Sequence, residues 1–218
     1  MKIIGHRGAK GLAPENTLAS LKKAIEHHVD MVEFDVRVTS DNQAVLHHNP
    51  EVIDPSGNHL KISNQTLAEL KQHKSDLALL DEAIKFIDNR AGILIEIKSG
   101  VEIKPIVSII ENTNLKLNEI IVCSFNVSIL RQIKVALPDV KIMIIEPWSG
   151  VRASHRARKL GTNLISMNQR WLWWGFIKSM SSTYKLYTYT LNDVQKARRW
   201  AKHGLAGVIT DYPDLFKC

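Results

Sequence analysis

Short apolar runs alternate along this chain with longer segments in which apolar residues recur every three or four positions. Most of the runs are rich in Val and Ile, as strands buried on both faces are. The runs are Ile3–Ile4, Met31–Val36, Gly92–Ile97, Ile120–Ser124, Val140–Ile145, Leu164–Met167, Leu186–Thr190 and Gly207–Thr210. Strands that alternate with helices predict an α/β fold with a parallel sheet, and eight repeats in 218 residues predict closure into a (β/α)₈ TIM barrel.

Two of the intervening segments show how the helices should begin. A helix that starts near Leu18 has Asn16 or Thr17 in the N-cap position, where a side-chain oxygen satisfies a free backbone N–H. Another helix is predicted over residues 193–203, with Asn192 as its N-cap. No internal repeat or low-complexity tract interrupts the pattern, so we expect a single barrel domain over residues 1–218.

One apolar run does not fit the alternation. Gln43–His47 follows the second strand after only a few residues, too few for the crossover that a parallel strand needs. We therefore expect a hairpin whose return arm brings His47 back opposite Asp35. The polar segment at about residues 49–74 is predicted to be an insertion over the barrel mouth, ending in a short helix near residues 66–72.

The composition is that of a globular protein with a basic bias. Hydrophobic residues make up 44% and charged residues 23%, and the net charge is +7. This charge favours anionic partners such as phosphates. The basic residues are spread along the chain, so we expect no nucleic-acid-binding stripe. The densest group is Arg152, Arg156, Arg158 and Lys159, which a solvated helix face would explain.

Cysteine usage and hydropathy bear on the compartment. Only Cys123, within an apolar run, and Cys218, at the end, are present, so no disulfide framework is expected. No apolar stretch is long enough for a transmembrane helix, and the first residues do not resemble a signal peptide. We expect a cytoplasmic location.

Polar residues gather where the predicted strands end, which is where barrels of this kind place their active sites. Residues two apart on a strand project to the same face, so a pair with that spacing points into the mouth together. These residues are His6 and Arg7 after the first strand, Glu33 and Asp35 on the second, Glu96 and Lys98 on the third, and Asp211 after the last.

Three carboxylates that converge on one point repel each other unless a cation lies between them. Glu33, Asp35 and Glu96 form such a set, and Mg²⁺ or Ca²⁺ is the natural occupant of an all-oxygen site. The alternative is a structural network of ion pairs with Arg7 and Lys98. His6 and His47 lie near the same point, and two histidines beside a metal suit acid–base chemistry at neutral pH, although each alone could be structural.

The same residues fall within blocks that resemble the signatures of the glycerophosphodiester phosphodiesterase family. The resemblance extends over nearly the whole chain, in order. The blocks are His6-Arg7-Gly8, Pro14-Glu15-Asn16-Thr17, Glu33-Phe34-Asp35-Val36, Val45-Leu46-His47, Glu96-Ile97-Lys98, Ser124-Phe125, Tyr189-Thr190-Leu191-Asn192 and Gly207-Val208-Ile209-Thr210-Asp211-Tyr212-Pro213.

The resemblance implies a metal-dependent hydrolysis of glycerophosphodiesters to sn-glycerol 3-phosphate and an alcohol, within glycerol and lipid metabolism. It also implies a role for each matching residue. Glu33, Asp35 and Glu96 would bind the metal, His6 and His47 would be the general base and acid, Arg7 and Lys98 would hold phosphoryl oxygens, Glu15 would orient Arg7 or touch the metal, and Phe125 and Tyr189 would line the glycerol side.

Two positions depart from the family pattern. His48 stands where the family usually has Asp, and Pro55 where it tends to have Arg. Neither departure removes a ligand or an acid–base group, so they bear on substrate range and rate. Because the polar residues are aimed at the phosphate, similar rates are expected for choline, ethanolamine and glycerol leaving groups.

Other functions stay open at this level. Trp171, Trp173 and Trp174 could rim the mouth and hold an acyl chain or contact a membrane surface, as a lysophospholipase D- or sphingomyelinase D-like enzyme would require. They could equally pack a helix against the barrel. A catalytically inactive phosphate-binding barrel is a further alternative, although all the ligands and both histidines are present. The sequence does not predict an oligomeric state.

Overall fold

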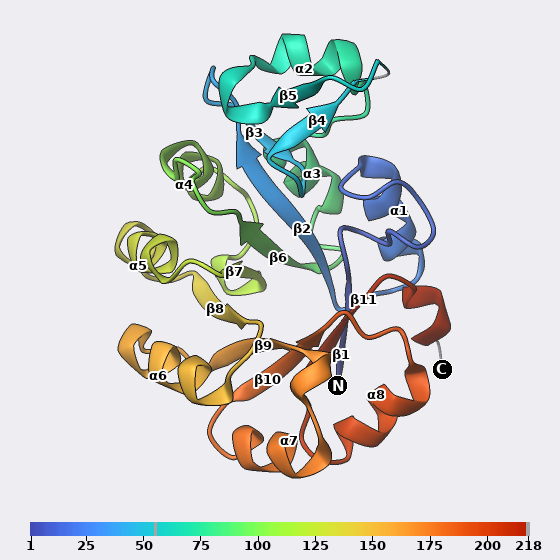
Figure 1. The fold of residues 1–218 in the computed structure, drawn as a ribbon, viewed down its shortest axis with the longest axis vertical. Coiled ribbons are helices and arrows are strands. Elements are labelled where there is room, and N and C mark those ends of the chain that lie inside the picture. Colours follow the sequence, from blue (N-terminus) through green and yellow to red (C-terminus); the bar gives the residue numbers. More distant parts are fainter. Residues whose placement is uncertain (55, 217–218) are drawn as a thin grey trace.

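The computed structural model describes residues 1–54 and 56–216 and shows a closed barrel of eight parallel strands surrounded by helices (Figure 1). β1 pairs with both β11 and β2, which closes the barrel. The eight predicted strands are confirmed, with bounds that shift by one or two residues. They are β1 (Lys2–Gly5), β2 (Met31–Val38), β6 (Gly92–Ile97), β7 (Ile120–Ser124), β8 (Lys141–Glu146), β9 (Leu164–Asn168), β10 (Lys185–Tyr189) and β11 (Gly207–Thr210).

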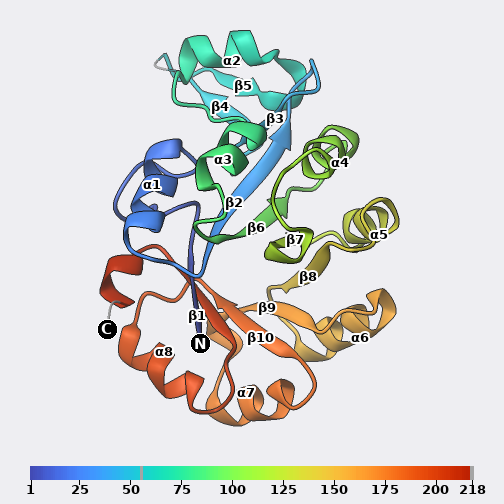
Figure 2. The ribbon, with the colours of Figure 1, turned by 180° about the vertical axis from the view of Figure 1, so that it is seen from behind.

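Helices cover the outside of the barrel, as both face-on views show (Figures 1 and 2). Isoleucine, valine and leucine side chains of the strands and helices interlock there in the main core. The helices are α1 (Leu18–Glu26), α3 (Leu80–Ile87), α4 (Lys104–Glu111), α5 (Val127–Ala136), α6 (Gly150–Leu160), α7 (Trp174–Ser181) and α8 (Val194–Ala201), and short 3-10 turns occur at Ile62–Asn64, Leu117–Glu119, Gln169–Trp171 and Pro213–Phe216.

The helix caps confirm one prediction and correct another. Thr17 caps α1, and its side chain accepts a hydrogen bond from the backbone N–H of Ser20. The N-cap of α8 is Asp193, whose carboxylate accepts from the backbone of Lys196. The prediction of Asn192 as this cap was wrong, because its side chain instead binds residues at the end of β11.

The predicted hairpin is confirmed in direction and register. β3 (Ala44–Leu46) runs antiparallel to β2, with Val36 opposite Leu46. The register continues past the strand, since the backbone N–H of His47 donates to the carbonyl of Asp35 at 3.0 Å. His47 therefore returns opposite Asp35, as the loop length predicts.

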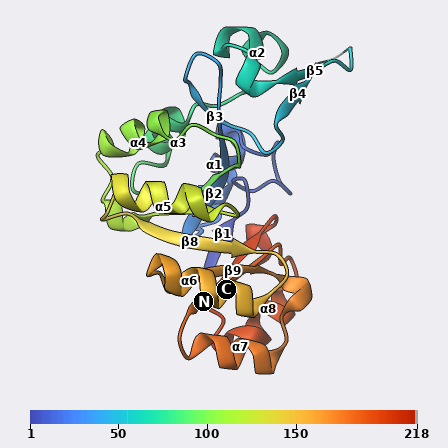
Figure 3. The ribbon, with the colours of Figure 1, turned by 60° about the vertical axis from the view of Figure 1, so that its left-hand side comes forward.

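The insertion that follows forms a small unit of its own. It contains β4 (Glu51–Ile53), β5 (His59–Lys61) and α2 (Leu67–His73), and it extends from the side of the barrel beyond the end of β2 (Figure 3). Its apolar side chains form a separate core, made of Val45, Val52, Ile62, Leu70 and Leu77. Pro55, the second departure from the family pattern, lies outside the described residues.

A second apolar cluster fills the barrel interior with side chains such as Ile4, Leu94 and Met143. Cys123 belongs to this cluster, and burial raises the pKa of its thiol well above the ordinary value. Cys218 lies outside the described residues. None of the described helices is long and apolar enough to cross a bilayer. The cytoplasmic location stays a prediction.

Candidate active site at the barrel mouth

Two strands end against the same edge of β2, and this places the candidate site. β6 occupies one edge of β2, so β1 and β3, which also pair with β2, share the other. β1 ends with Gly5 opposite Val32, and β3 arrives from the opposite direction with Leu46 opposite Val36. The residues that follow each strand, His6 and His47, therefore approach the stretch of β2 that carries the carboxylates.

The three predicted carboxylates converge in the structure. Glu33, Asp35 and Glu96 each offer an oxygen within 4.8 Å of the other two. Asp35 and Glu96 are register partners on neighbouring strands, and Glu33 precedes Asp35 by one inward position. Glu33 and Asp35 are almost fully buried. The sequence spacing therefore brings all three together as expected.

The three carboxyl groups differ in the direction in which their surroundings shift their pKa values. Burial, together with neighbouring Asp35 and Glu96, raises the pKa of Glu33 well above its ordinary value. Burial alone would raise the pKa of Asp35 as well, but Lys98 and Arg7 lower it. The pKa of Glu96 is raised, by burial and by Asp35. Without a further cation, the site favours keeping a proton on one of its carboxyls.

Two cations of the chain lie against this cluster. Lys98 Nζ is 2.6 Å from Asp35 Oδ1 and also forms an ion pair with Glu96. Arg7 Nε is 3.1 Å from Asp35 Oδ2. Glu33 has no ion-pair partner among the described residues and is held by the backbone N–H of Arg7, at 2.7 Å from its Oε2. When all three carboxyls are ionised, the three negative and two positive side chains leave a net charge of −1.

Arg7 is fixed by a tight turn and by Glu15. Arg7 has a φ of 50° and Gly8 a φ of 84°, and a Cβ on Gly8 would lie 2.4 Å from Ser20 Oγ, so glycine is required there. Arg7 Nη1 donates to both carboxylate oxygens of Glu15, at 2.8 and 2.9 Å. Of the two roles expected for Glu15, the structure shows it orienting Arg7, and Glu15 is not part of the carboxylate cluster.

Two asparagines hold site residues in ways that the sequence did not reveal. Asn16 donates to Asp35 Oδ2 at 2.9 Å, and its own Oδ1 accepts from the Asp35 backbone at 3.1 Å. Asn192 binds Asp211 in the same two-sided manner, at 3.0 and 2.9 Å. Asp211 Oδ1 in turn lies 2.6 Å from His6 Nδ1. A carboxylate at Nδ1 fixes that nitrogen as the donor and leaves Nε2 of His6 free.

The two adjacent histidines, His47 and His48, both lie near the site. His47 Nδ1 donates to the backbone carbonyl of Asn49 at 2.9 Å, and burial lowers the pKa of its imidazole. The strand ends at Leu46, so strict alternation of faces does not extend to His48. His48 lines a cleft next to Glu96 and Lys98.

A small cavity leads from the carboxylates into the barrel. His6, Glu33 and Glu96 form its polar side, and Phe125 and Tyr189 lie across it with their rings edge to face at 6.2 Å. The hydroxyl groups of Tyr189 and Ser166 are buried here and have no hydrogen-bond partner within the described residues. Ser166 was not among the predicted site residues.

The donor set suits a hard divalent cation. All three clustered side chains offer carboxylate oxygens, the ligands that Mg²⁺ and Ca²⁺ prefer. The one carboxylate without a cationic partner, Glu33, is buried and has a raised pKa, which is what an ion at this point would relieve. The residues present therefore fit the expected cation.

Four tryptophans in the segments that follow β8 and β9 are exposed. Trp171 packs against Trp148, which follows β8, with ring centroids 6.2 Å apart. Exposed fractions are 65% for Trp148, 49% for Trp171, 58% for Trp173 and 60% for Trp174. About half or more of each side chain is exposed, while Trp174 also packs against His203 with ring centroids 5.9 Å apart, so both alternatives stay predictions.

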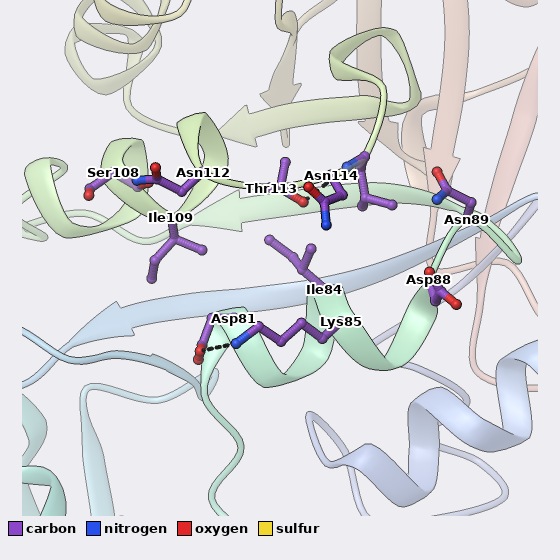
Figure 4. Close-up of a pocket in the computed structure, with 11 residues that line it drawn as sticks. Asp81, Ile84, Lys85, Asp88, Asn89, Ser108, Ile109, Asn112, Thr113 and Asn114 are labelled. Atoms are coloured by element: carbon purple, nitrogen blue, oxygen red, sulfur yellow. Dashed lines mark hydrogen bonds and ion pairs between the residues drawn. The ribbon is translucent and has the colours of Figure 1, made fainter.

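The basic group on α6 is partly structural. Arg152 and Arg156 bind Glu146, a fully buried carboxylate at the end of β8, at 2.7 and 3.0 Å. Another groove, of about 400 Å³, lies between α3 and α4 (Figure 4). Its lining includes the ion pair of Lys85 and Asp81 and none of the predicted site residues.

Comparisons with known proteins agree with the geometry. A sequence model of the glycerophosphoryl diester phosphodiesterase family matches residues 6–215. The glycerophosphodiester phosphodiesterase of Caldanaerobacter subterraneus subsp. tengcongensis is 28% identical, over 97% of this chain and 94% of its own. A lysophospholipase D of Homo sapiens is 31% identical, over 54% of this chain and 37% of its own.

A solved structure gives the same result for the fold. An Oleispira antarctica phosphodiesterase, solved in complex with the product sn-glycerol-3-phosphate, is 26% identical and superimposes with a TM-score of 0.89, over 99% of this chain and 95% of the other. Because the family match extends over nearly the whole described barrel, this chain is an enzyme, a phosphoric diester hydrolase, and it belongs to the glycerophosphoryl diester phosphodiesterase family.

Proposed function

We propose that the enzyme hydrolyses glycerophosphodiesters to sn-glycerol 3-phosphate and an alcohol, using one divalent cation and two histidines. The observation that carries the proposal is the convergence of three carboxylates, two of them almost fully buried, on the neighbouring strands β2 and β6. The product bound to the Oleispira antarctica phosphodiesterase supports the same chemistry.

Glu33, Asp35 and Glu96 would hold the cation. When bound, Mg²⁺ or Ca²⁺ supplies positive charge that offsets the charge developing on the phosphoryl oxygens. Arg7 supports this role from the protein side, because Glu15 and Asp35 fix its guanidinium beside the cluster. Lys98, now paired with two carboxylates, is a second group that would face phosphoryl oxygens.

His6 is proposed as the general base. Asp211 orients its Nδ1–H, so Nε2 is the nitrogen available to take a proton from the nucleophile. The Asp211 carboxylate also balances the charge that His6 then acquires. His47 is proposed as the general acid that protonates the departing alcohol. Its Nδ1 is held by the carbonyl of Asn49, so Nε2 is the nitrogen available to donate a proton.

Phe125 and Tyr189 would accommodate the glycerol side of the substrate. The aromatic rings offer apolar surface to its carbon atoms. The unpaired Tyr189 hydroxyl, whose pKa is raised by burial, stays protonated and can donate to a glycerol hydroxyl. The nucleophile is either the glycerol 2-hydroxyl, which would give a cyclic phosphate, or water.

The test is a product assay with and without the cation. Glycerophosphocholine is incubated with the enzyme in Mg²⁺, in Ca²⁺ and in excess chelator, and glycerol 3-phosphate and choline are measured. The proposal expects both products with a cation and none in chelator. Full activity in chelator would rule the cation out, and choline phosphate as product would rule out the assigned bond.

A second candidate function is a lysophospholipase D-like activity, and the exposed tryptophans favour it. Trp148 and Trp171 follow the C-terminal ends of β8 and β9, so an acyl chain or a membrane surface could contact them. Each buried CH₂ would contribute about 0.8 kcal/mol to binding. If lysophosphatidylcholine exceeds glycerophosphocholine in kcat/KM and Trp148→Ala or Trp171→Ala removes that advantage, this second function replaces the first.

A further inference from the structure

A cleft of about 300 Å³ opens beside the carboxylates, on the side away from the barrel interior. Arg37 from β2 and His48 from the loop after β3 line it together with Lys98. It shares Glu96 and Phe125 with the small cavity that contains Tyr189, so the two spaces meet at the carboxylate cluster.

This arrangement matches the shape of a phosphodiester. The phosphorus is tetrahedral, so the two ester arms leave it in different directions. A phosphoryl group at the carboxylate cluster can direct its glycerol arm towards Tyr189. The other arm, the leaving alcohol, then enters the cleft of Arg37 and His48.

Arg37 is a cation without an acidic partner. Its Nε and Nη2 donate to the carbonyl of His48 at 3.0 and 2.7 Å. No ion pair of Arg37 occurs within the described residues, whereas Arg7 and Lys98 are both paired with carboxylates. A guanidinium has five N–H donors, so the remaining ones are available to a ligand.

The rest of the lining adds little negative charge. His48 uses Nδ1 to bind the side-chain oxygen of Asn49 at 2.8 Å, which leaves Nε2 free. Among the described residues along the cleft, Glu96 is the sole acid, and it forms an ion pair with Lys98, which Asp35 shares. Arg37 therefore supplies the positive charge of the cleft, and His48 offers a second hydrogen-bonding group to whatever enters.

We propose that Arg37 and His48 form a subsite for an anionic group on the leaving alcohol, so that the enzyme favours alcohols that carry a carboxylate or a phosphate. The inference rests on the proposed function and adds a substrate preference to it. It leaves the expectation of similar rates for choline, ethanolamine and glycerol in place, since none of these carries an anionic group.

The test compares glycerophosphoserine with glycerophosphoethanolamine, which differ only in one carboxylate. We expect kcat/KM to favour the serine substrate by about 5–10-fold, the worth of one partly exposed charge-assisted pair. Arg37→Gln should bring that ratio to about 1, and His48→Asp, which adds a carboxylate to the cleft, should bring it below 1. The matched control Arg170→Gln changes an exposed arginine after β9 and should keep the ratio.

Equal kcat/KM values for the two substrates, or a ratio that survives Arg37→Gln, would overturn the inference. If that variant does not fold, the unaltered enzyme still decides, because an electrostatic preference must weaken as NaCl is raised. A preference unchanged by salt overturns the subsite. Cleavage of neither substrate overturns the proposed function itself, whereas equal cleavage of both overturns the subsite alone.

Discussion

Replacing Glu33 by Gln separates a cation site from a structural network of ion pairs. Glu33 lies within 4.8 Å of Asp35 and Glu96 but has no cationic partner among the described residues. At 4.8 Å two unit charges repel by about 3–4 kcal/mol with an effective dielectric constant of about 20. The raised pKa of Glu33, caused by burial and by the neighbouring carboxylates Asp35 and Glu96, is the expected response to this repulsion.

The substitution keeps the shape and the hydrogen bond of the side chain. The amide oxygen of Gln can accept from the Arg7 backbone as Glu33 Oε2 does at 2.7 Å. In chelator we therefore expect the free energy of unfolding to stay the same or rise by up to about 2 kcal/mol. For a chain of this size, ~1 kcal/mol corresponds to roughly 2–4 °C in Tm. Stabilisation by Mg²⁺ or Ca²⁺ should disappear.

The assay is thermal and urea unfolding of both proteins, in chelator and with each cation. Glu146→Gln is the control, because Glu146 is a buried carboxylate that binds Arg152 and Arg156 and does not belong to the carboxylate cluster. This control should lose about 1–3 kcal/mol whether or not a cation is present. A comparable loss for Glu33→Gln in chelator would instead show that Glu33 belongs to a structural network of ion pairs.

The remaining predictions concern acid–base groups, pH and the leaving alcohol. His6→Ala and His47→Ala should each lower kcat by about 10²–10⁴-fold, and the double variant should cost less than the product of the two, because both act in one reaction. With glycerophosphocholine, His48→Ala should lower kcat far less than His47→Ala, because His48 lines the leaving-alcohol cleft and choline carries no anionic group for it to bind. If His48→Ala lowers kcat more, the two histidines exchange their proposed roles. Cation affinity, measured by calorimetry, should rise with pH above the ordinary titration range of a glutamate, because the pKa of Glu33 is raised and the cation displaces its proton. An affinity that does not change with pH would contradict this.

Local patterns were enough to predict the strands, the hairpin and the carboxylate cluster. Inward residues alternate along a strand, and neighbouring strands align their ends at the mouth, so Glu33, Asp35 and Glu96 had to converge once the barrel closed. The short loop before Gln43 fixed the register that returns His47 to Asp35.

Local sequence patterns could not predict contacts between residues that are far apart in the sequence. His6 and Asp211 are 205 positions apart, and their pairing depends on β1 and β11 being neighbours. The prediction of Asn192 as the N-cap of α8 was wrong for the same reason, because its side chain binds Asp211, a residue distant in the sequence. His48 lies beyond the end of β3 at Leu46, and the alternation of apolar residues does not predict where that strand ends.

A cation held by Glu33, Asp35 and Glu96 is proposed to enable this barrel to cleave glycerophosphodiesters. The most direct measurement is release of glycerol 3-phosphate from glycerophosphocholine by the metal-stripped enzyme, with Mg²⁺ or Ca²⁺ added back, beside the Glu33→Gln variant. We predict no product from the stripped enzyme, restored release on addition of the cation, and none from the variant under either condition. Product at the full rate from the stripped enzyme, or from Glu33→Gln, would contradict the account.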